Sequence, residues 1–308
     1  MRVAELAGIV AVLVTVAAAF GALQEAFAQQ LVREGAMEKL VLDGGEDVSP
    51  WGVAEATVTA DPAHVKQGKA AMHLAIPVDH HAGQPDYPIG WPRTYRDFKE
   101  PWQQDWSSFE FFSFAIYSAT SRDALPGEPL GLILYTPDKT RAYNRQLTEL
   151  RKDEWVHFVI PLSEIPRHEK VMRIQFYISE SQYRHGDTLE FYVDDIALTR
   201  YAEPTIGAFA VGQKAIWADA RWLPVMFRML GLRGEQTATV EFEAREGRRV
   251  VATATQTVGR GEQGVWIDLG AKPLPPGSCG VAARLRGRQE WVTAPVRVVA
   301  SPWQEALK

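Results

Sequence analysis

Cysteine is nearly absent from this chain: Cys279 is the only one in 308 residues. The chain therefore can form no intramolecular disulfide and no cysteine-based zinc site. Cys279 lies in PLPPGSCGVAARL, at the start of a predicted strand. That position is typical of a small buried side chain rather than of a nucleophile.

Basic charge is not in excess either. The chain has 33 Lys and Arg against 38 Asp and Glu, a net charge of −5, so we expect no binding to nucleic acid. It contains no H-E-x-x-H, no G-x-S-x-G, no Walker loop and no Rossmann glycine run, so no common catalytic or nucleotide-binding motif is present. What the chain does have is 46% hydrophobic residues, enough for roughly two domains.

One long apolar run stands at the N-terminus, over residues 9–23. It is followed by Ala26-Phe27-Ala28, a small-x-small site, and the run is shorter than the ~20 residues that span a membrane. We interpret residues 1–28 as a signal peptide, which places the protein outside the cell, in the periplasm or in the cell envelope. An uncleaved membrane anchor is the alternative.

Short strands of alternating polarity follow a lead of residues 29–39, which we expect to be helical or disordered. The first domain is predicted over residues 40–201. Its strands include 108–118, 129–137, 140–150, 154–162, 170–179 and 188–199. Many short strands with this spacing indicate an antiparallel jelly-roll β-sandwich. The alternation places Tyr143, Arg145, His157, Arg173, Gln175 and Tyr177 together on one outward, concave face.

A long proline-rich loop at residues 79–106 interrupts the strands. Its aromatic residues argue against disorder, so it either closes the end of the sandwich or presents rings to a ligand. Trp91, Tyr95 and Trp102 are the ring-presenting candidates. Trp106 leads directly into a strand and is expected in the core.

A second β pattern begins after a linker at residues 202–207. Seven strand-like segments fill residues 208–303, which is typical of an immunoglobulin-like sandwich. Two of them join at Glu246-Gly247 as a predicted hairpin. The whole chain is therefore predicted to be all-β, a jelly roll followed by an immunoglobulin-like domain.

Two adjacent carboxylates, Asp194 and Asp195, interrupt the apolar alternation of the strand TLEFYVDDIALT. A charge inside such a strand is costly unless it is paired, hydrogen-bonded or bound to a metal. Asp43, Glu46 and Asp47 occur at the first turn of the same domain, and Ca²⁺ takes oxygen ligands of this kind. Either a calcium ion ties the two segments together, or Asp194 caps a bulge through backbone N–H groups while Asp195 faces solvent.

The order of LVLDGGED, VKQGKAAMHL, DEWVHFVIPLSEI, MRIQFYIS and TLEFYVDDIAL resembles the galactose-binding-like β-jelly-roll carbohydrate-binding modules of secreted glycosidases. The resemblance covers residues 38 to 200. It implies a structural calcium ion held by the opening acid, a backbone carbonyl and the first Asp of the last strand. Carried over to this chain, the ligands are Asp43 or Glu46, the carbonyl of Gly68 or Lys69, and Asp194.

The function we expect is non-catalytic binding of an oligosaccharide or polysaccharide at the concave face. Flat aromatic rings suit the apolar faces of sugars, and a few fixed polar groups suit their hydroxyls. One alternative is a small glycoside hydrolase or polysaccharide lyase on the same face. Another is a structural envelope protein whose aromatic loop docks on a protein. The partner, besides the sugar, would be a secreted glycosidase or an envelope protein.

Overall fold

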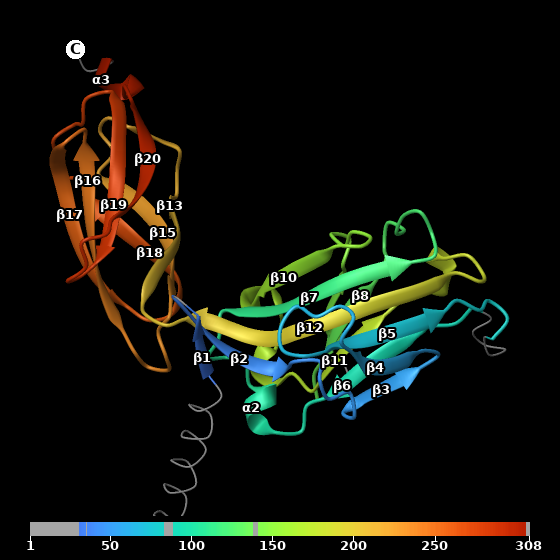
Figure 1. Cartoon of the computed structure of the whole chain (residues 1–308). Coiled ribbons are helices and arrows are strands. Elements are labelled where there is room, and N and C mark those ends of the chain that lie inside the picture. The colour runs from blue at the N-terminus through green and yellow to red at the C-terminus, as the bar shows by residue number, and fades with distance from the viewer. Residues whose placement is uncertain (1–30, 35, 83–88, 138–140, 306–308) are drawn as a thin grey trace, which may run out of the picture. The chain divides into compact units, whose positions relative to one another are not determined.

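The computed structural model describes residues 31–34, 36–82, 89–137 and 141–305 (Figure 1). The predicted signal peptide lies outside these residues. Strands dominate the described chain, and the all-β prediction is confirmed. The chain divides into two compact units, one ending at Arg200 and the other beginning at Tyr201.

The first unit is a sandwich of two sheets. The first is here called the β12 sheet. Its strand order is β1 (Leu31–Glu34), β2 (Met37–Asp43), β12 (Thr188–Tyr201), β5 (Ala71–Pro77) and β4 (Thr57–Asp61). In addition, β7 (Phe111–Thr120) pairs with β12, and β10 (Trp155–Pro161) pairs with β7. The second, here called the β11 sheet, has the order β3 (Trp51–Ala54), β6 (Arg93–Asp97), β11 (Arg173–Tyr177), β8 (Gly131–Tyr135) and β9 (Arg141–Gln146). The short helices are α2 (Pro101–Gln104), η1 (Leu162–Glu164), η2 (His168–Lys170) and η3 (Glu180–Gln182).

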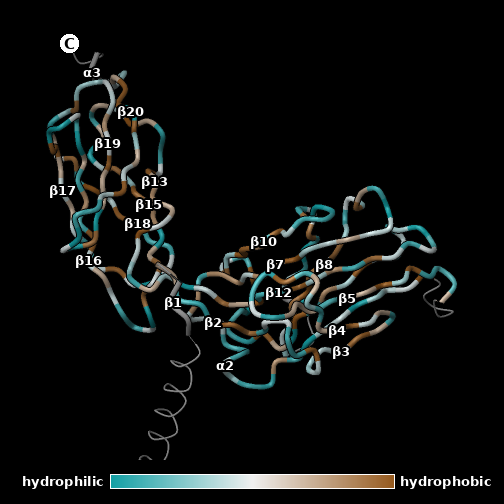
Figure 2. Tube along the Cα trace, in the orientation of Figure 1, coloured by the Kyte–Doolittle hydropathy of each residue, from teal (hydrophilic) through white to brown (hydrophobic). Residues whose placement is uncertain are grey.

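The core of this unit follows from the alternation along its strands (Figure 2). Phe112, Phe114 and Trp106 are fully buried, as are Ile174 and Phe176 across the sandwich. The expectation that Trp106 belongs to the core is confirmed. Burial of such rings is the main stabilising contribution in a two-layer β domain.

The lead at residues 29–39 was predicted wrongly, as far as it is described. Residues 31–34 and 37–43 form the hairpin β1–β2, in which Leu31 pairs with Leu40 and Glu34 with Met37. The first unit therefore begins its sheet before residue 40. The two segments pair with each other, and such a local pairing outweighs the weak alternation that suggested a lead without strands.

The second unit is a smaller sandwich with its own core. One sheet has the order β13 (Thr205–Val211), β15 (Trp222–Leu230) and β18 (Gly261–Asp268). The other has the order β14 (Ala215–Trp217), β20 (Val292–Val299), β19 (Gly277–Leu285), β16 (Ala238–Glu246) and β17 (Arg249–Val258), and the short helix α3 (Pro302–Glu305) follows. The hairpin predicted at Glu246-Gly247 is confirmed, with Glu246 paired to Arg249. Cys279 is buried, as predicted.

Candidate functional site

The outer face of the β11 sheet carries part of the predicted ligand site. Along β11, Ile174 and Phe176 point into the core, so Arg173, Gln175 and Tyr177 point to the outer face. Gln175 pairs across the sheet with Tyr95 of β6, which lies on the same face. These four predicted residues are therefore brought together.

Two tyrosines lie across glycines on this face. Tyr95 is directly opposite Gly52 of β3, and a Cβ atom added to Gly52 would lie 2.4 Å from the Tyr95 ring. Tyr177 is directly opposite Gly131 of β8, where an added Cβ would lie 2.2 Å from the ring. Glycine inside a strand commonly marks such a close approach. Both rings can lie against the sheet only because these two positions have no side chain.

Polar groups fix both rings. The hydroxyl of Tyr177 donates to Asn144 Oδ1 at 3.1 Å and accepts a hydrogen bond from Gln146 Nε2 at 3.0 Å. The guanidinium carbon of Arg173 stands 4.1 Å from the centre of the Tyr95 ring. Asp97 holds Arg173 through two hydrogen bonds of 2.6 and 2.9 Å. This face therefore combines aromatic rings with amide, hydroxyl and guanidinium groups.

Gln175 lies among these groups but, unlike Tyr177 and Arg173, it has a polar atom without a hydrogen-bond partner in the described part of the chain. The residue is only 3% exposed, and its Nε2 atom has no hydrogen-bond partner among the described residues. A buried donor that is left unpaired costs about 1–3 kcal/mol, so most folds avoid it.

Trp91 borders the same face. Its ring contacts that of Tyr177 edge-on, with centroids 5.6 Å apart, and the guanidinium groups of Arg93 and Arg141 lie 4.8 and 5.4 Å from its centre. The backbone N–H of Trp91 donates to Glu55 Oε2 at 2.6 Å. As a whole residue, Trp91 is half-buried.

A buried carboxylate holds the loop that carries Trp91. Glu180 accepts hydrogen bonds from the backbone N–H of Asp79 at 3.2 Å and of Gly90 at 2.9 Å. These residues lie on either side of residues 83–88, which fall outside the described residues. One glutamate of η3 thereby fixes both described ends of the loop beside the β11 sheet.

Four predicted ligand residues lie elsewhere, and for Tyr143, Arg145 and His157 the shared-face prediction is wrong. Tyr143 and Arg145 pair with Leu134 and Leu132, which are core residues, so both point toward the inner face. The cause is a bulge in β9, because the register shifts between its pairings with Leu134 and Tyr135. Desolvation by this burial raises the pKa of Tyr143.

His157 and Trp102 are displaced for other reasons. His157 lies on β10 of the β12 sheet, opposite Ala115, and is exposed on that sheet rather than on the β11 sheet. Trp102 belongs to α2 and packs against the hydrophobic core. Alternation fixes the two faces of each strand, but it does not say which sheet a strand joins.

The acidic residues of the predicted calcium site are largely paired. Asp43 accepts hydrogen bonds from Gly45 N–H at 2.7 Å and from the Trp51 indole N–H at 2.9 Å, and it forms an ion pair with Arg96. A guanidinium in contact with Asp43 opposes a second cation there. The expectation that Asp43 opens a calcium site is therefore not supported by its surroundings.

Asp194 holds a loop. It is fully buried, and its Oδ2 atom accepts the backbone N–H of Lys66 at 2.7 Å and of Gln67 at 2.9 Å. Its Oδ1 atom accepts the N–H of Asp195 at 2.6 Å. Desolvation by burial raises the pKa of Asp194, against the three N–H bonds that lower it. This is the capping role that the sequence left open beside calcium.

Asp195 does not face solvent as that alternative supposed, since it forms an ion pair with Lys39 at 2.6 Å.

Glu46 is the acidic residue that remains near the loop. It is exposed, and its Oε1 atom accepts the Lys69 N–H at 3.2 Å. A Cβ atom at Gly68, whose φ is +76°, would lie 1.9 Å from the same Oε1 atom. Among the described residues no three His, Cys, Asp or Glu side chains form a metal-binding group.

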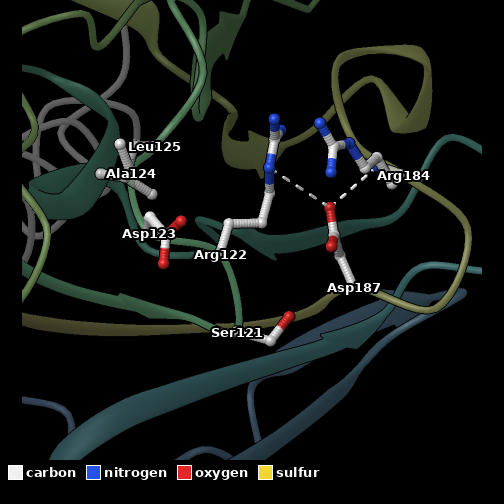
Figure 3. A pocket seen from close by; sticks show the side chains of 7 residues that line it. All are labelled: Ser121, Arg122, Asp123, Ala124, Leu125, Arg184 and Asp187. Atoms are coloured by element: carbon white, nitrogen blue, oxygen red, sulfur yellow. Dashed lines mark hydrogen bonds and ion pairs between the residues drawn. The ribbon is translucent and has the colours of Figure 1, made fainter.

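A polar cavity of about 420 Å³ lies at another position in the first unit (Figure 3). Its walls are Ser121, Arg122, Asp123, Ala124, Leu125, Arg184 and Asp187. Asp187 accepts the Arg184 N–H at 2.8 Å and lies 3.7 Å from Arg122 Nε. None of the predicted ligand residues lines it.

The outer face of the β11 sheet with Trp91, Tyr95, Arg173, Gln175 and Tyr177 is here called the platform. The sequence did not predict several residues that contribute to it. Gly52, Gly131, Asn144 and Gln146 contribute through cross-strand neighbours that sequence order does not reveal, and Glu180 contributes by accepting N–H groups of the loop. The two strand glycines, Gly52 in β3 and Gly131 at the start of β8, were the available signal, because glycine weakens a strand unless something approaches closely.

The sequence matches no protein-family model and no curated protein. Among solved structures, the chain is similar to the CBM27-1 domain of Caldicellulosiruptor saccharolyticus in complex with mannohexaose, at 14% identity and a TM-score of 0.32, over 52% of this chain and 95% of that one. It is also similar to a β-1,2-glucanase from Parabacteroides distasonis, at 12% identity and a TM-score of 0.37, over 84% of this chain but only 37% of the glucanase. The D0-D1 domain of intimin matches at 10% identity and a TM-score of 0.24, over 68% of this chain and 90% of that one. With TM-scores below 0.5, the fold assignment rests on the strand pairing itself.

No helix among the described residues is long and apolar enough to cross a membrane.

Proposed function

We propose that the outer face of the β11 sheet binds an oligosaccharide or polysaccharide without catalysis. In this proposal the first unit is a carbohydrate-binding module of the galactose-binding-like type, and the second unit is an immunoglobulin-like spacer or docking domain. The observation that carries it is the grouping of Trp91, Tyr95 and Tyr177 on one face with Gln175, whose buried amide nitrogen is unpaired among the described residues. Ligand sites combine apolar walls with a few fixed polar groups in this way.

Each part of the face has a role in the proposal. The ring of Trp91, a half-buried residue, would stack on the apolar face of a sugar ring. Arg93 and Arg141, which flank that ring, would donate to ring hydroxyls. Gln175 Nε2 would donate to a hydroxyl once the ligand displaces part of its cover, which removes the cost of the unpaired donor.

Affinity electrophoresis against a panel of soluble polysaccharides tests this proposal. We expect at least one polysaccharide to retard the protein, and Trp91→Ala to weaken the binding by about tenfold, the loss of one stacked ring. His157→Ala is the matched control, because this exposed ring lies on the other sheet. No retardation by any polysaccharide, or equal retardation of both variants, would contradict the proposal.

A glycoside hydrolase or lyase on this face has less support. Tyr143 and Arg145 point inward and His157 lies on the other sheet, so these three side chains do not meet on this face as an acid–base set would require. Glu55 and Glu180 both lie beside Gly90, but each accepts backbone N–H bonds that position the loop. A docking role for the aromatic loop would appear instead as protein association without sugar binding.

Calcium is retained as part of the proposal with a changed ligand set. Glu46, Asp194 and the carbonyl of Gly68 or Lys69 would hold the ion, and Asp43 would not, because it is paired with Arg96. The ion would cross-link the first turn to the last strand. A thermal midpoint that falls in chelator and recovers with Ca²⁺, but not in Glu46→Ala, would support this; an unchanged midpoint would remove calcium from the account.

We also propose export, with residues 1–28 removed, because an apolar run precedes the A-x-A site. The protein would then meet its polysaccharide, and a glycosidase or envelope partner, outside the cytoplasm. Sequencing the N-terminus of the protein from the extracellular or periplasmic fraction tests this. A chain that still begins at Met1 would contradict it.

A further inference from the structure

The second unit exposes an apolar face that the saccharide proposal does not use. It lies on the sheet β13-β15-β18. Trp266 is 65% exposed, Met226 is 56% exposed and Trp222 is 47% exposed. Their strand neighbours Val225, Phe227, Val265 and Ile267 are buried in the core, so the three large side chains share the outer face. Contiguous apolar surface of this kind commonly marks an interaction site.

At two successive cross-strand pairs of this face, a large side chain lies opposite a small one. Trp266 of β18 is opposite Pro224 of β15, and Met226 of β15 is opposite Gly264 of β18. On the other side of Met226, β13 presents Ala210. The large side chain therefore belongs to β18 in the Pro224–Trp266 pair and to β15 in the next outward-facing pair, Met226–Gly264.

Charged pairs close both ends of this face. At one end Arg228 of β15 is opposite Glu262 of β18, with 3.0 Å between Arg228 Nε and Glu262 Oε1. At the other end Asp268 of β18 is opposite Trp222 and lies 3.5 Å from Arg221. Each pair contains one positive and one negative side chain, so the two charged ends of the face have no net charge.

We infer that this face binds a second copy of the chain through a two-fold axis parallel to β15 and β18. Such an axis places β15 of one copy over β18 of the other at the same level. Trp266 then lies over the partner's Pro224, Met226 over the partner's Gly264, and Arg228 over the partner's Glu262. At these three contacts a large side chain meets a small one, or a positive charge meets a negative one, as an isologous interface requires.

The alternative in-plane axis does not give this match. A two-fold axis across the strands places β18 on the partner's β18 with the levels reversed. Asp268 would then face the partner's Glu262, and like charges in contact are strongly unfavourable. The register of this sheet therefore favours one dimer geometry and disfavours the other.

Sedimentation equilibrium on the purified protein tests the inference. We expect the weight-average mass to rise toward that of a dimer with concentration. Trp266→Ser should weaken association by at least about tenfold, the loss of a central anchor. Trp303→Ser, at a site of similar exposure outside the sheet, is its matched control. A protein that stays monomeric at all concentrations overturns the inference. This holds also if Trp266 is found to bind a polysaccharide instead of a second copy of the chain.

Charge reversal tests the register itself. Arg228→Glu and Glu262→Arg each place like charges across the axis, so each variant alone should associate at least about tenfold more weakly. An equimolar mixture of the two should associate like the unchanged protein, because each charge then faces its opposite. Arg249→Glu, in the exposed pair of the β16–β17 hairpin, should have no effect.

Both substitutions are at the surface, and circular dichroism shows whether each variant is folded. Recovery of association in the mixture therefore cannot be confused with an effect on folding. Folded variants that dimerise alone, or whose mixture does not recover association, contradict the proposed axis. The saccharide proposal is unaffected by either outcome, since its residues belong to the first unit.

Discussion

Asp194 is the residue at which the alternation of β12 breaks, and the structure gives the reason. Leu189, Phe191 and Val193 point inward before it, and Ile196 and Leu198 point inward after it. The register shifts between Asp194 and Ala197, and Asp195 adopts a φ of +57°. One extra residue in a bulge therefore restores the inward phase, at the cost of two carboxylates that need partners.

The sequence could show that these carboxylates need partners but not which partners they have. The N–H groups that Asp194 accepts belong to Lys66 and Gln67, in a loop that precedes it by more than a hundred residues. Backbone donors carry no sequence signature, so calcium and backbone capping could not be separated by spacing.

Replacing Asp194 by Ala should lower the free energy of unfolding of the first unit by about 2 kcal/mol, because three backbone N–H groups lose their acceptor. Urea unfolding followed by tryptophan fluorescence measures this. Asp47→Ala is the control, since Asp47 is exposed and accepts the backbone N–H of Ser49. Equal stability of the two variants would show that Asp194 does not hold the loop.

His157 should titrate below the ordinary histidine pKa of about 6.5. Desolvation lowers the pKa of His157, Lys39 and Lys66 lower it further, and Asp195 opposes them. As the pH falls, the unfolded chain takes up this proton first, so protonation here favours unfolding. Ring signals in an NMR titration measure the pKa, and Asp195→Asn should lower it again; a rise would contradict the proposed surroundings.

Strand β11 and strand β9 show what period-two alternation can and cannot predict. β11 has no bulge, and the faces of Arg173, Gln175 and Tyr177 followed directly from the sequence. β9 contains a bulge that its sequence does not announce, so Tyr143 and Arg145 change face. A single inserted residue reverses every side chain beyond it.

Gly131→Ala should weaken saccharide binding by about tenfold and lower the thermal midpoint, because the added Cβ displaces the nearly buried Tyr177 ring. The displaced ring would lose its hydrogen bonds to Asn144 and Gln146. Affinity electrophoresis and thermal unfolding measure the two effects. Gly280→Ala is the control, as nothing lies within 4 Å of its added Cβ; binding unchanged in Gly131→Ala would show that the position of Tyr177 is not needed.

Across the whole molecule, two separate hydrophobic cores match the two β patterns of the sequence. The all-β class could be predicted because alternation, turns and strand lengths agree along the chain. The composition of the candidate site could not, because it depends on which strands become neighbours. Only Trp91, Tyr95, Arg173, Gln175 and Tyr177 remain of the predicted ligand set.

A chain that ends at Tyr201 should bind the polysaccharide within about twofold of the whole protein, because every residue of the platform and its core lies in the first unit. Titration calorimetry on both proteins measures this. A folded truncated chain that no longer binds would move the binding site to the second unit.

Oxidative footprinting of the tryptophans tests saccharide binding on the β11 sheet most directly. Hydroxyl radicals modify accessible rings, and mass spectrometry reads each tryptophan separately with and without the retarding polysaccharide. We expect the polysaccharide to protect Trp91, while the exposed residues Trp217, Trp222, Trp266 and Trp303 keep their reactivity. Protection of any of these four with Trp91 unchanged would contradict it.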